Sequence, residues 1–510
     1  MTGNALVKSG LCAKSLLDVG AATDRLGKTL NPRRPTTQLL LIALVGIAHG
    51  LTVAAEPTAR VDARLQADLA VVKEFRPAYP FWQHIFTITD GRIAFGSALD
   101  GRLVATFPAK GGDWLKDGLW VDPTMSSATL GPRPFPVGLD DRREEVARRL
   151  APTVGPVLSN PTRGLFLLPN VPKYGPFVGE WSLIYERFGV PADIGLAQAV
   201  LESGLNGTAR SRANALGLCQ FLRRNWDTLN RLSPEHIEAY NQTTQAPYCA
   251  AYLSILATMY GSFIPALSEH HSGGVNVGRT LINGERLGGV TVQQQYLRGS
   301  QFARELRSVA LQRYRDLYRT YGIRSFRYAE MVFGNTITVK RIRDDVPQDR
   351  IFAMRTPRII PIGEITKRTT LTATEVQRFN PALTRSVPAK ANLYLPMRVP
   401  EFGADVSFWH QPPSPEYATA LDEFLQLDAG VQRWHEASFE PVLQGFRRRF
   451  EATNTEEGRV MATMLAYVIG DLRNSRRAAI LEEFRTNGKI LTLFKQGVSE
   501  LSTMVASGQQ

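Results

Sequence analysis

The chain has 510 residues, of which 44% are hydrophobic and 21% are charged. This composition excludes a disordered, collagen-like or disulfide-dense chain, and the length allows two to four domains at roughly 150 residues each. The formal net charge of +13 favours an anionic partner: nucleic acid, anionic lipid or cell-wall polymer. Only three cysteines are present, and no zinc-ligand spacing occurs.

The first 55 residues predict a secretory signal. Arg33 and Arg34 precede an apolar run at 39–45, and small residues lead up to Ala55, after which cleavage is expected. The run is short for a membrane span, and the alternative is an uncleaved signal anchor that would attach the chain to a membrane. Export argues against a nucleic-acid partner. It favours the periplasm or cell envelope of a bacterium.

Residues 56–175 predict an N-terminal module with β-hairpins. Two Asp-Gly pairs, Asp90-Gly91 and Asp100-Gly101, are flanked by β-prone runs, a pattern typical of hairpin turns. Proline-rich sequence follows, and a charged helix is predicted over 140–150.

The rest of the chain is predicted to be mainly α. Residues 176–325 are helical in pattern. Residues 345–400 read as a small module of strand, helices and strand, with strands near 351–354 and 393–396. A proline-rich linker at 411–415 leads to a C-terminal helical region at 414–505.

Glu202 is the first candidate for chemistry. Pro191 and Asp193 suit the first turn of a helix, and Ser203-Gly204 can end it. Apolar residues recur within it at helical spacing: Ile194, Ala197 and Leu201. Beside such a stripe a carboxylate is partly desolvated, so the pKa of Glu202 is expected to rise, as a general acid requires. The alternative is a solvated glutamate at a helix end.

No cofactor or metal site is predicted. P-loop, G-x-S-x-G, H-E-x-x-H and paired C-x-x-C motifs are absent from the sequence. The adjacent pair His270-His271 is a poor metal clamp, because neighbours on a helix point about 100° apart.

The segment from Glu202 to Gln220 resembles the catalytic motif of the soluble lytic transglycosylase (SLT) family. That motif, E-S-x-x-N…A-x-S-x-x-G-A-x-G-L-M-Q, fits without gaps and matches its Glu, Ser, Asn, Ala, Ser, Ala, Gly, Leu and Gln. Downstream, AAYL at 250–253 resembles the family's G-x-x-Y-L helix. The segment ALSEHHSG at 266–273 lies where A-L-A-A-Y-N-A-G belongs.

The sequence departs from the family pattern at several positions. Leu205 replaces an aromatic residue, Asn214 a glycine and Cys219 a methionine or tryptophan, while His270-His271 stands where Tyr-Asn is expected. Tyr240-Asn241 is the wrong substitute, because it precedes the Tyr252 helix.

The resemblance implies a lysozyme-like helical domain that cleaves the MurNAc-GlcNAc β-1,4 bond of peptidoglycan. Glu202 would protonate the glycosidic oxygen and then act as a base, while the substrate's own C6 hydroxyl closes a 1,6-anhydromuramoyl product. Substrate-binding roles are implied for six further residues: Ser203, Ser211, Gln220, Tyr252, His270 and His271.

Two alternatives stay open at this point. A hydrolytic muramidase on the same fold needs a second carboxylate to activate water, and Glu269 is the nearest candidate in the sequence. A non-catalytic peptidoglycan-binding or scaffold protein is the other.

The family resemblance also bears on the thiols. Cys219 and Cys249 fall in two segments that both line the family's groove, so an oxidising compartment would favour a disulfide between them. The alternative is two buried, reduced thiols.

Two flanking segments carry looser resemblances. Residues 362–396 resemble a LysM module, a β-α-α-β unit that binds N-acetylglucosamine polymers, with Ala389-Lys390-Ala391 in place of the usual P-G-x. The alternative is a purely structural module. Residues 81–87 (FWQHIFT) resemble the segment ahead of the catalytic domain in membrane-bound lytic murein transglycosylase D-like proteins.

Overall fold

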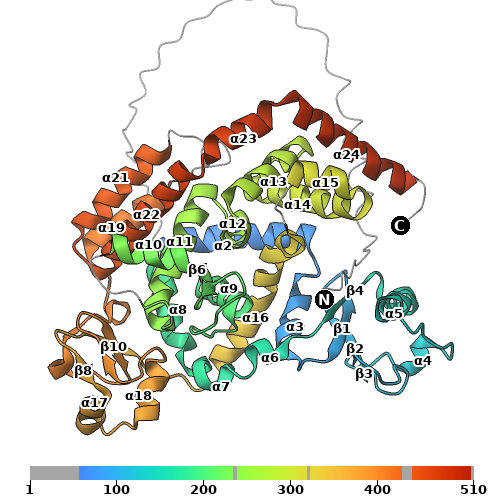
Figure 1. Ribbon diagram of the computed structural model, residues 1–510. Coiled ribbons are helices and arrows are strands. Elements are labelled where there is room, and N and C mark those ends of the chain that lie inside the picture. Colours follow the sequence, from blue (N-terminus) through green and yellow to red (C-terminus); the bar gives the residue numbers. More distant parts are fainter. Residues whose placement is uncertain (1–56, 234–237, 319–321, 428–438, 507–510) are drawn as a thin grey trace, which may run out of the picture.

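The computed structural model describes residues 57–233, 238–318, 322–427 and 439–506, and it is mainly helical with four small sheets (Figure 1). The predicted signal at 1–55 lies outside the described residues. Within those residues, no helix combines the length and apolar character needed to cross a membrane.

The N-terminal part begins with α2 (Pro57–Phe75), η1 (Tyr79–Trp82) and α3 (Gln83–Thr87). A four-stranded antiparallel sheet follows in the order β3-β2-β1-β4. Its strands are β1 (Arg92–Ser97), β2 (Leu103–Pro108), β3 (Leu119–Trp120) and β4 (Val157–Pro161), and it is accompanied by α4 (Ser127–Leu130) and α5 (Leu139–Val154).

The sheet has a hydrophobic core of its own. Side chains alternate along β1, so that Ile93 and Phe95 join this core with Trp114 and Leu150, while Ala94 faces the main core. The sheet therefore separates two apolar layers.

One hairpin prediction is wrong. Asp100-Gly101 lies in the turn between β1 and β2, with Gly101 at φ 75°, but Asp90-Gly91 follows a helix. The residues before it are helical because Phe81, Trp82, Ile85 and Phe86 recur at helical spacing and are all buried in the main core.

The central part is an assembly of helices around α9. In chain order this part begins with α6 (Gly164–Leu167), α7 (Val171–Tyr174), η2 (Gly175–Phe177), α8 (Val178–Arg187) and α9 (Ala192–Ser203). A hairpin of β5 (Ala215–Leu216) and β6 (Phe221–Leu222) precedes α10 (Arg223–Leu232), α11 (Gln242–Tyr260), α12 (Phe263–Ser272) and α13 (Gly274–Arg286). The part closes with α14 (Val292–Val309), α15 (Leu311–Tyr318), η3 (Ile323–Arg327) and α16 (Tyr328–Asp345). Helix α9 packs against α8, α11 and α16.

Residues 352–405 form a compact unit with a separate apolar core. Its elements are β7 (Phe352–Arg355), β8 (Ile360–Pro361), α17 (Ile362–Thr369), α18 (Ala373–Phe379), β9 (Ser386–Val387), β10 (Asn392–Leu395), η4 (Pro400–Phe402) and β11 (Ala404–Asp405). Strand β7 lies between β10 and β11. The unit contacts the central helices through Tyr394, whose hydroxyl lies 2.6 Å from that of Thr244 on α11.

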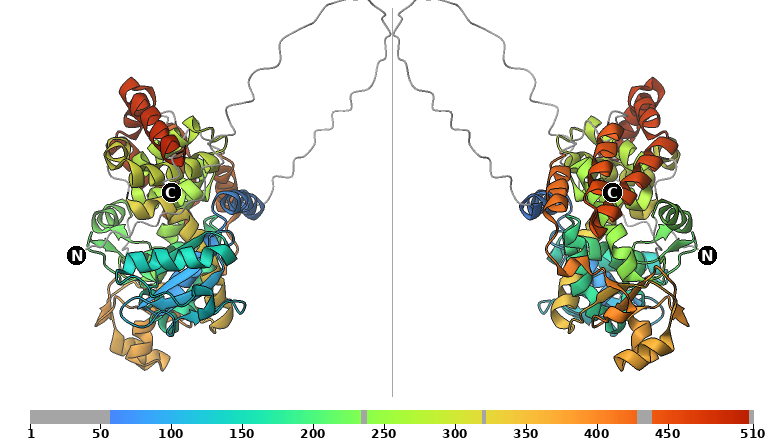
Figure 2. Two further views of the ribbon diagram at one scale, coloured as in Figure 1. Left: turned by 90° about the vertical axis from the view of Figure 1, so that its right-hand side faces the viewer. Right: turned by 90° about the vertical axis from the view of Figure 1, so that its left-hand side faces the viewer.

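The C-terminal region is helical and runs along the central helices. After η5 (Phe408–His410) it comprises α19 (Pro415–Leu425), α21 (Phe439–Ala452), α22 (Glu456–Asn474), α23 (Arg477–Thr486) and α24 (Gly488–Ala506). Helix α22 contacts α10 and α11, α23 contacts α13, and α24 contacts α14 and α15. Figures 1 and 2 show α23 and α24 at the end of the molecule opposite α17 and α18.

Candidate active site

Helix α9 carries Glu202 in its last turn. Pro191 occupies the N-cap, just before the first turn in which the sequence placed it, and Gly204 ends the helix in the left-handed region at φ 60°, as predicted. A Cβ at Gly204 would overlap the carbonyl group of Phe166, so only glycine fits there. The helix is buried on nearly every side rather than along one stripe, and the side chain of Glu202 is 15% exposed.

Ser203 fixes the segment that faces α9. Its hydroxyl donates to the carbonyl oxygens of Leu218 at 2.9 Å and Ala199 at 3.1 Å, and the residue is only 2% exposed. The hydroxyl is thus buried and bonded inside the protein, and the substrate-binding role of Ser203 stays a prediction. The Ser203 side chain holds the 217–220 strip beside Glu202.

Ser211 and Gln220 also bind backbone. The Ser211 hydroxyl accepts the N–H of Ala215, and the Gln220 side chain donates to the carbonyl oxygens of Ala209 and Gly217. Asn214, at the family's glycine position, has φ 62°, a conformation that asparagine tolerates better than most residues. The structure thus gives Ser211 and Gln220 contacts that shape the loop, and their roles toward a sugar stay predictions.

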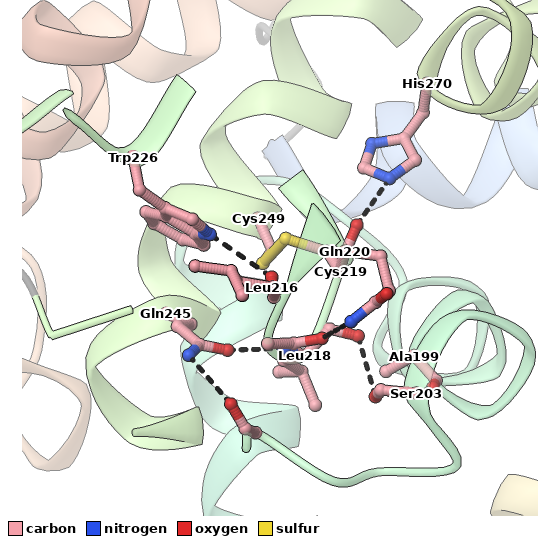
Figure 3. The surroundings of a disulfide bond; sticks show 12 residues. Ala199, Ser203, Leu216, Leu218, Cys219, Gln220, Trp226, Gln245, Cys249 and His270 are labelled. Carbon is pink, nitrogen blue, oxygen red and sulfur yellow. Dashed lines mark hydrogen bonds between the residues drawn. A yellow bond between two sulfur atoms is a disulfide. The ribbon is translucent and has the colours of Figure 1, made fainter. Parts of the chain in front are cut away.

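Cys219 and Cys249 form a disulfide with a Cα–Cα separation of 6.1 Å, which confirms that prediction (Figure 3). The bond ties the strip after β5 to α11. On the other side of the strip, His270 donates its Nε2 hydrogen to the carbonyl oxygen of Cys219 at 2.7 Å. Because a carbonyl oxygen only accepts, this bond places a proton on Nε2 of His270.

The two histidines of α12 have different surroundings. His270 lies among aromatic rings, with centroids 5.3 Å from Phe221 and 5.8 Å from Tyr252. Nδ1 of His271 is 3.8 Å from Oε1 of Glu202. The structure therefore brings Glu202 and His271 together directly. His270 is held near them by its hydrogen bond to Cys219 in the 217–220 strip. Tyr252 packs against His270, with ring centroids 5.8 Å apart.

Tyr328 is a site residue that the sequence reasoning missed. Its hydroxyl donates to Oε1 of Glu202 at 2.5 Å, and its ring stacks on His271 at 4.4 Å between centroids and 10° between planes. Tyr328 begins α16 and lies 126 residues after Glu202, beyond the predicted end of the domain at 325. No local spacing connects it to Glu202; only the packing of α16 on α9 does so.

The expected rise in the pKa of Glu202 is wrong. Burial alone raises the pKa of this carboxyl, but the nearby imidazoles of His271 and His270 and the hydrogen bond from Tyr328 outweigh it, so the pKa lies below its ordinary value. Burial lowers the pKa of the His270 imidazole, partly offset by Glu202. The site therefore favours an ionised Glu202 in the free protein.

Glu269, the candidate second carboxylate, is engaged elsewhere. It is 5% exposed, its Oε1 lies 2.8 Å from Nη1 of Arg477, and its Oε2 accepts the hydroxyl hydrogen of Tyr260. A carboxylate held in this way is not free to activate water, so the structure contradicts this candidate.

The remaining sequence features have structural roles. Asn241 caps α11, accepting the backbone N–H groups of Thr243 and Thr244, in agreement with its rejection as a site residue. Among the described residues, no group of three or more His, Cys, Asp or Glu side chains has the arrangement of a metal site.

Comparison with known proteins bears on the central helices. No curated protein matches the chain. Residues 181–287 match the family model of the Transglycosylase SLT domain, a range that contains Glu202, the disulfide and both histidines but ends before Tyr328. This match supports an SLT-type, lysozyme-like helical domain in this chain and, at the level of the family, a lytic transglycosylase that acts on peptidoglycan.

Proposed function

We propose that the chain is an exported peptidoglycan lytic transglycosylase that cleaves the MurNAc-GlcNAc β-1,4 bond. The observation that carries the proposal is the setting of Glu202, which lies in the last turn of a buried helix inside the matched SLT segment and receives a hydrogen bond from Tyr328. The predicted leader and the positive net charge support the cell envelope as its place of action.

In this mechanism Glu202 acts twice. Its protonated carboxyl donates the proton to the glycosidic oxygen as the bond from that oxygen to the MurNAc anomeric carbon breaks. The resulting carboxylate then takes the proton of the C6 hydroxyl, whose oxygen bonds to the anomeric carbon and closes the 1,6-anhydro ring. No water is consumed, and Glu202 is returned to its protonated form.

The electrostatics of the site favour the ionised form of Glu202 in the free protein, so the carboxyl must take up a proton before the first step. Burial raises the pKa of Glu202, but His271 and His270 on α12, with a smaller effect of the Tyr328 hydroxyl on α16, lower it by more, so the carboxylate is stabilised. The proton for the first step then requires mildly acidic conditions, or substrate binding that excludes water and strengthens burial.

The hydrolytic alternative lacks support at its proposed residue, because Glu269 is paired with Arg477. The test is digestion of purified sacculi followed by mass spectrometry of the released muropeptides. Anhydro products lack the water that hydrolytic products contain.

Glu202→Gln is the decisive variant, with Glu451→Gln, a partly exposed glutamate paired with Arg447 on α21, as the matched control. We expect anhydro-muropeptides from the parent chain and from the control, and none from Glu202→Gln. Release by Glu202→Gln at the parent rate would contradict the catalytic assignment of Glu202, whereas no release by the parent chain would leave a wall-binding role.

We also propose that residues 345–400 are a LysM-like module that binds N-acetylglucosamine polymers, in an arrangement like that of membrane-bound lytic murein transglycosylase D-like proteins. The order of β7, α17, α18 and β10 supports this proposal. Full-length Glu202→Gln protein should be retained on chitin beads and released by chitin oligomers. Passage through chitin together with retention on sacculi would contradict it.

A further inference from the structure

A buried ionic cluster lies directly beside the histidine pair. Nη1 of Arg477 is 2.8 Å from Oε1 of Glu269, and the two side chains are only 3% and 5% exposed. Tyr260 completes the cluster: its hydroxyl donates to Oε2 of Glu269 and accepts from Nη2 of Arg477. The three residues come from α23, α12 and α11.

The cluster fixes the end of α12. Glu269 immediately precedes His270-His271, and its backbone oxygen accepts the N–H of Gly273 at 2.8 Å. A Cβ at Gly274 would overlap the guanidinium group of Arg477, so this group lies tightly against the junction of α12 and α13. Any displacement of Arg477 therefore acts on the turn that carries both histidines.

The Glu269–Arg477 pair departs from the SLT motif that this segment of the sequence resembles. The family's A-L-A-A-Y-N-A-G segment has alanine where Glu269 stands, followed by the Tyr-Asn that His270-His271 replaces. A buried carboxylate at this position requires a counter-ion. Arg477 supplies it from 208 residues away, far beyond the matched segment.

We propose that Arg477 is a positioning residue for the reaction: through Glu269 it holds the last turn of α12 so that His271 stays against Glu202 and Tyr328. This inference rests on the proposed function. It assigns to the C-terminal region a direct role in the geometry of the active site. Removing the Glu269–Arg477 ion pair should lower kcat more than it changes KM, because the contact that is altered is the one between His271 and Glu202 and not one with the glycan.

The test uses the full-length chain and three variants. Arg477→Met leaves Glu269 without its counter-ion and is expected to fold poorly. Glu269→Ala combined with Arg477→Met removes both charges and restores the family's alanine, so it should fold. Arg485→Met is the matched control, because Arg485 joins the same helix, α23, to Glu285 on α13 without contacting α12.

For the double variant we expect a kcat at least about tenfold below the parent, a KM within about threefold, and an unchanged rate for the control. The alkaline limb of its pH–rate profile should move to higher pH, because Glu202 loses stabilisation by His271. The charged and titratable groups that face these residues are Tyr328 on α16, Tyr252 and Tyr260 on α11, and Tyr467 and Asp471 on α22. A folded double variant with the parent's kcat and pH profile would overturn the proposal.

A second measurement does not depend on activity. In protein labelled with ¹³C-histidine, the ring protons of His271 should show an upfield shift from the stacked ring of Tyr328, and the double variant should lose it. Loss of this shift supports the positioning role even if Glu202→Gln proves fully active. Retention of the shift overturns the positioning role whatever the enzyme's products are.

Discussion

Asp68 on α2 is predicted to make the stability of the protein depend on pH. Its carboxylate accepts the backbone N–H of Phe263 at 2.6 Å, the Ser262 hydroxyl at 2.7 Å and the Gln293 amide at 3.0 Å. It therefore caps the N-terminus of α12. Burial nevertheless dominates and raises the pKa of Asp68 from 3.8 to about 6, despite the three donors.

The sign and size follow from linkage. Because the pKa is higher in the folded than in the unfolded state, the folded protein holds the proton more tightly, and this stabilisation is lost as pH rises from 3.8 through 6. The pKa of Asp68 differs by about 2 between the folded and unfolded states, and at 1.36 kcal/mol per pKa unit this corresponds to about 3 kcal/mol of folding free energy. Roughly 2–2.5 kcal/mol of this should be lost between pH 4 and pH 7.5.

The assay is urea denaturation, with the disulfide intact, of the parent and Asp68→Asn at a series of pH values. Taking the difference between the two proteins cancels the titration of all other groups. The parent should lose about 2–2.5 kcal/mol relative to Asp68→Asn from pH 4 to pH 7.5, while Asp316→Asn, an exposed control on α15, should follow the parent. A pH-independent difference between parent and Asp68→Asn, or one of opposite sign, would refute the reasoning.

Three further predictions concern the site and its supports. Tyr328→Phe should reduce the rate of muropeptide release about 10–100-fold. It should also move the alkaline limb of the pH–rate profile to higher pH, because the hydroxyl lowers the pKa of Glu202. An unchanged rate and profile would exclude a role for the hydroxyl. Replacing Cys219 and Cys249 by serine opens a loop of 30 residues and should cost roughly 3–4 kcal/mol in urea denaturation, whereas stability equal to that of the oxidised parent would show that the bond contributes nothing. Gly204→Ala, at φ 60° against the Phe166 carbonyl, should cost at least about 1–3 kcal/mol in thermal denaturation, while Gly363→Ala, which has open space around it, should not.

Local sequence signals predicted much of the central domain. Proline and glycine marked both ends of α9 because the caps of this helix are made by the residues that flank it in sequence. The disulfide followed from the resemblance, since Cys219 and Cys249 fall in segments that the fold brings together. The mainly helical fold was likewise predicted from pattern and family.

The errors and omissions share one physical cause. The pKa of Glu202 depends on Tyr328 and on the histidines of α12, and none of these contacts is local in sequence. The assignment of Glu269 failed because its partner, Arg477, lies in the C-terminal region. The prediction of a hairpin at Asp90-Gly91 was wrong because the preceding aromatic residues are buried in the main core, which favours a helix there.

The contacts of α12 also bear on how separable the matched segment is. Residues 181–287 contain every predicted site residue, yet the two ends of α12 are bound by Asp68 and Arg477, and Glu202 is bound by Tyr328. An excised segment would keep the motif but expose uncapped amide groups and leave the Glu269 carboxylate without its cation. In this chain the matched segment therefore cannot be exchanged by itself, and a chimera with another SLT protein must include α2, α16 and α23.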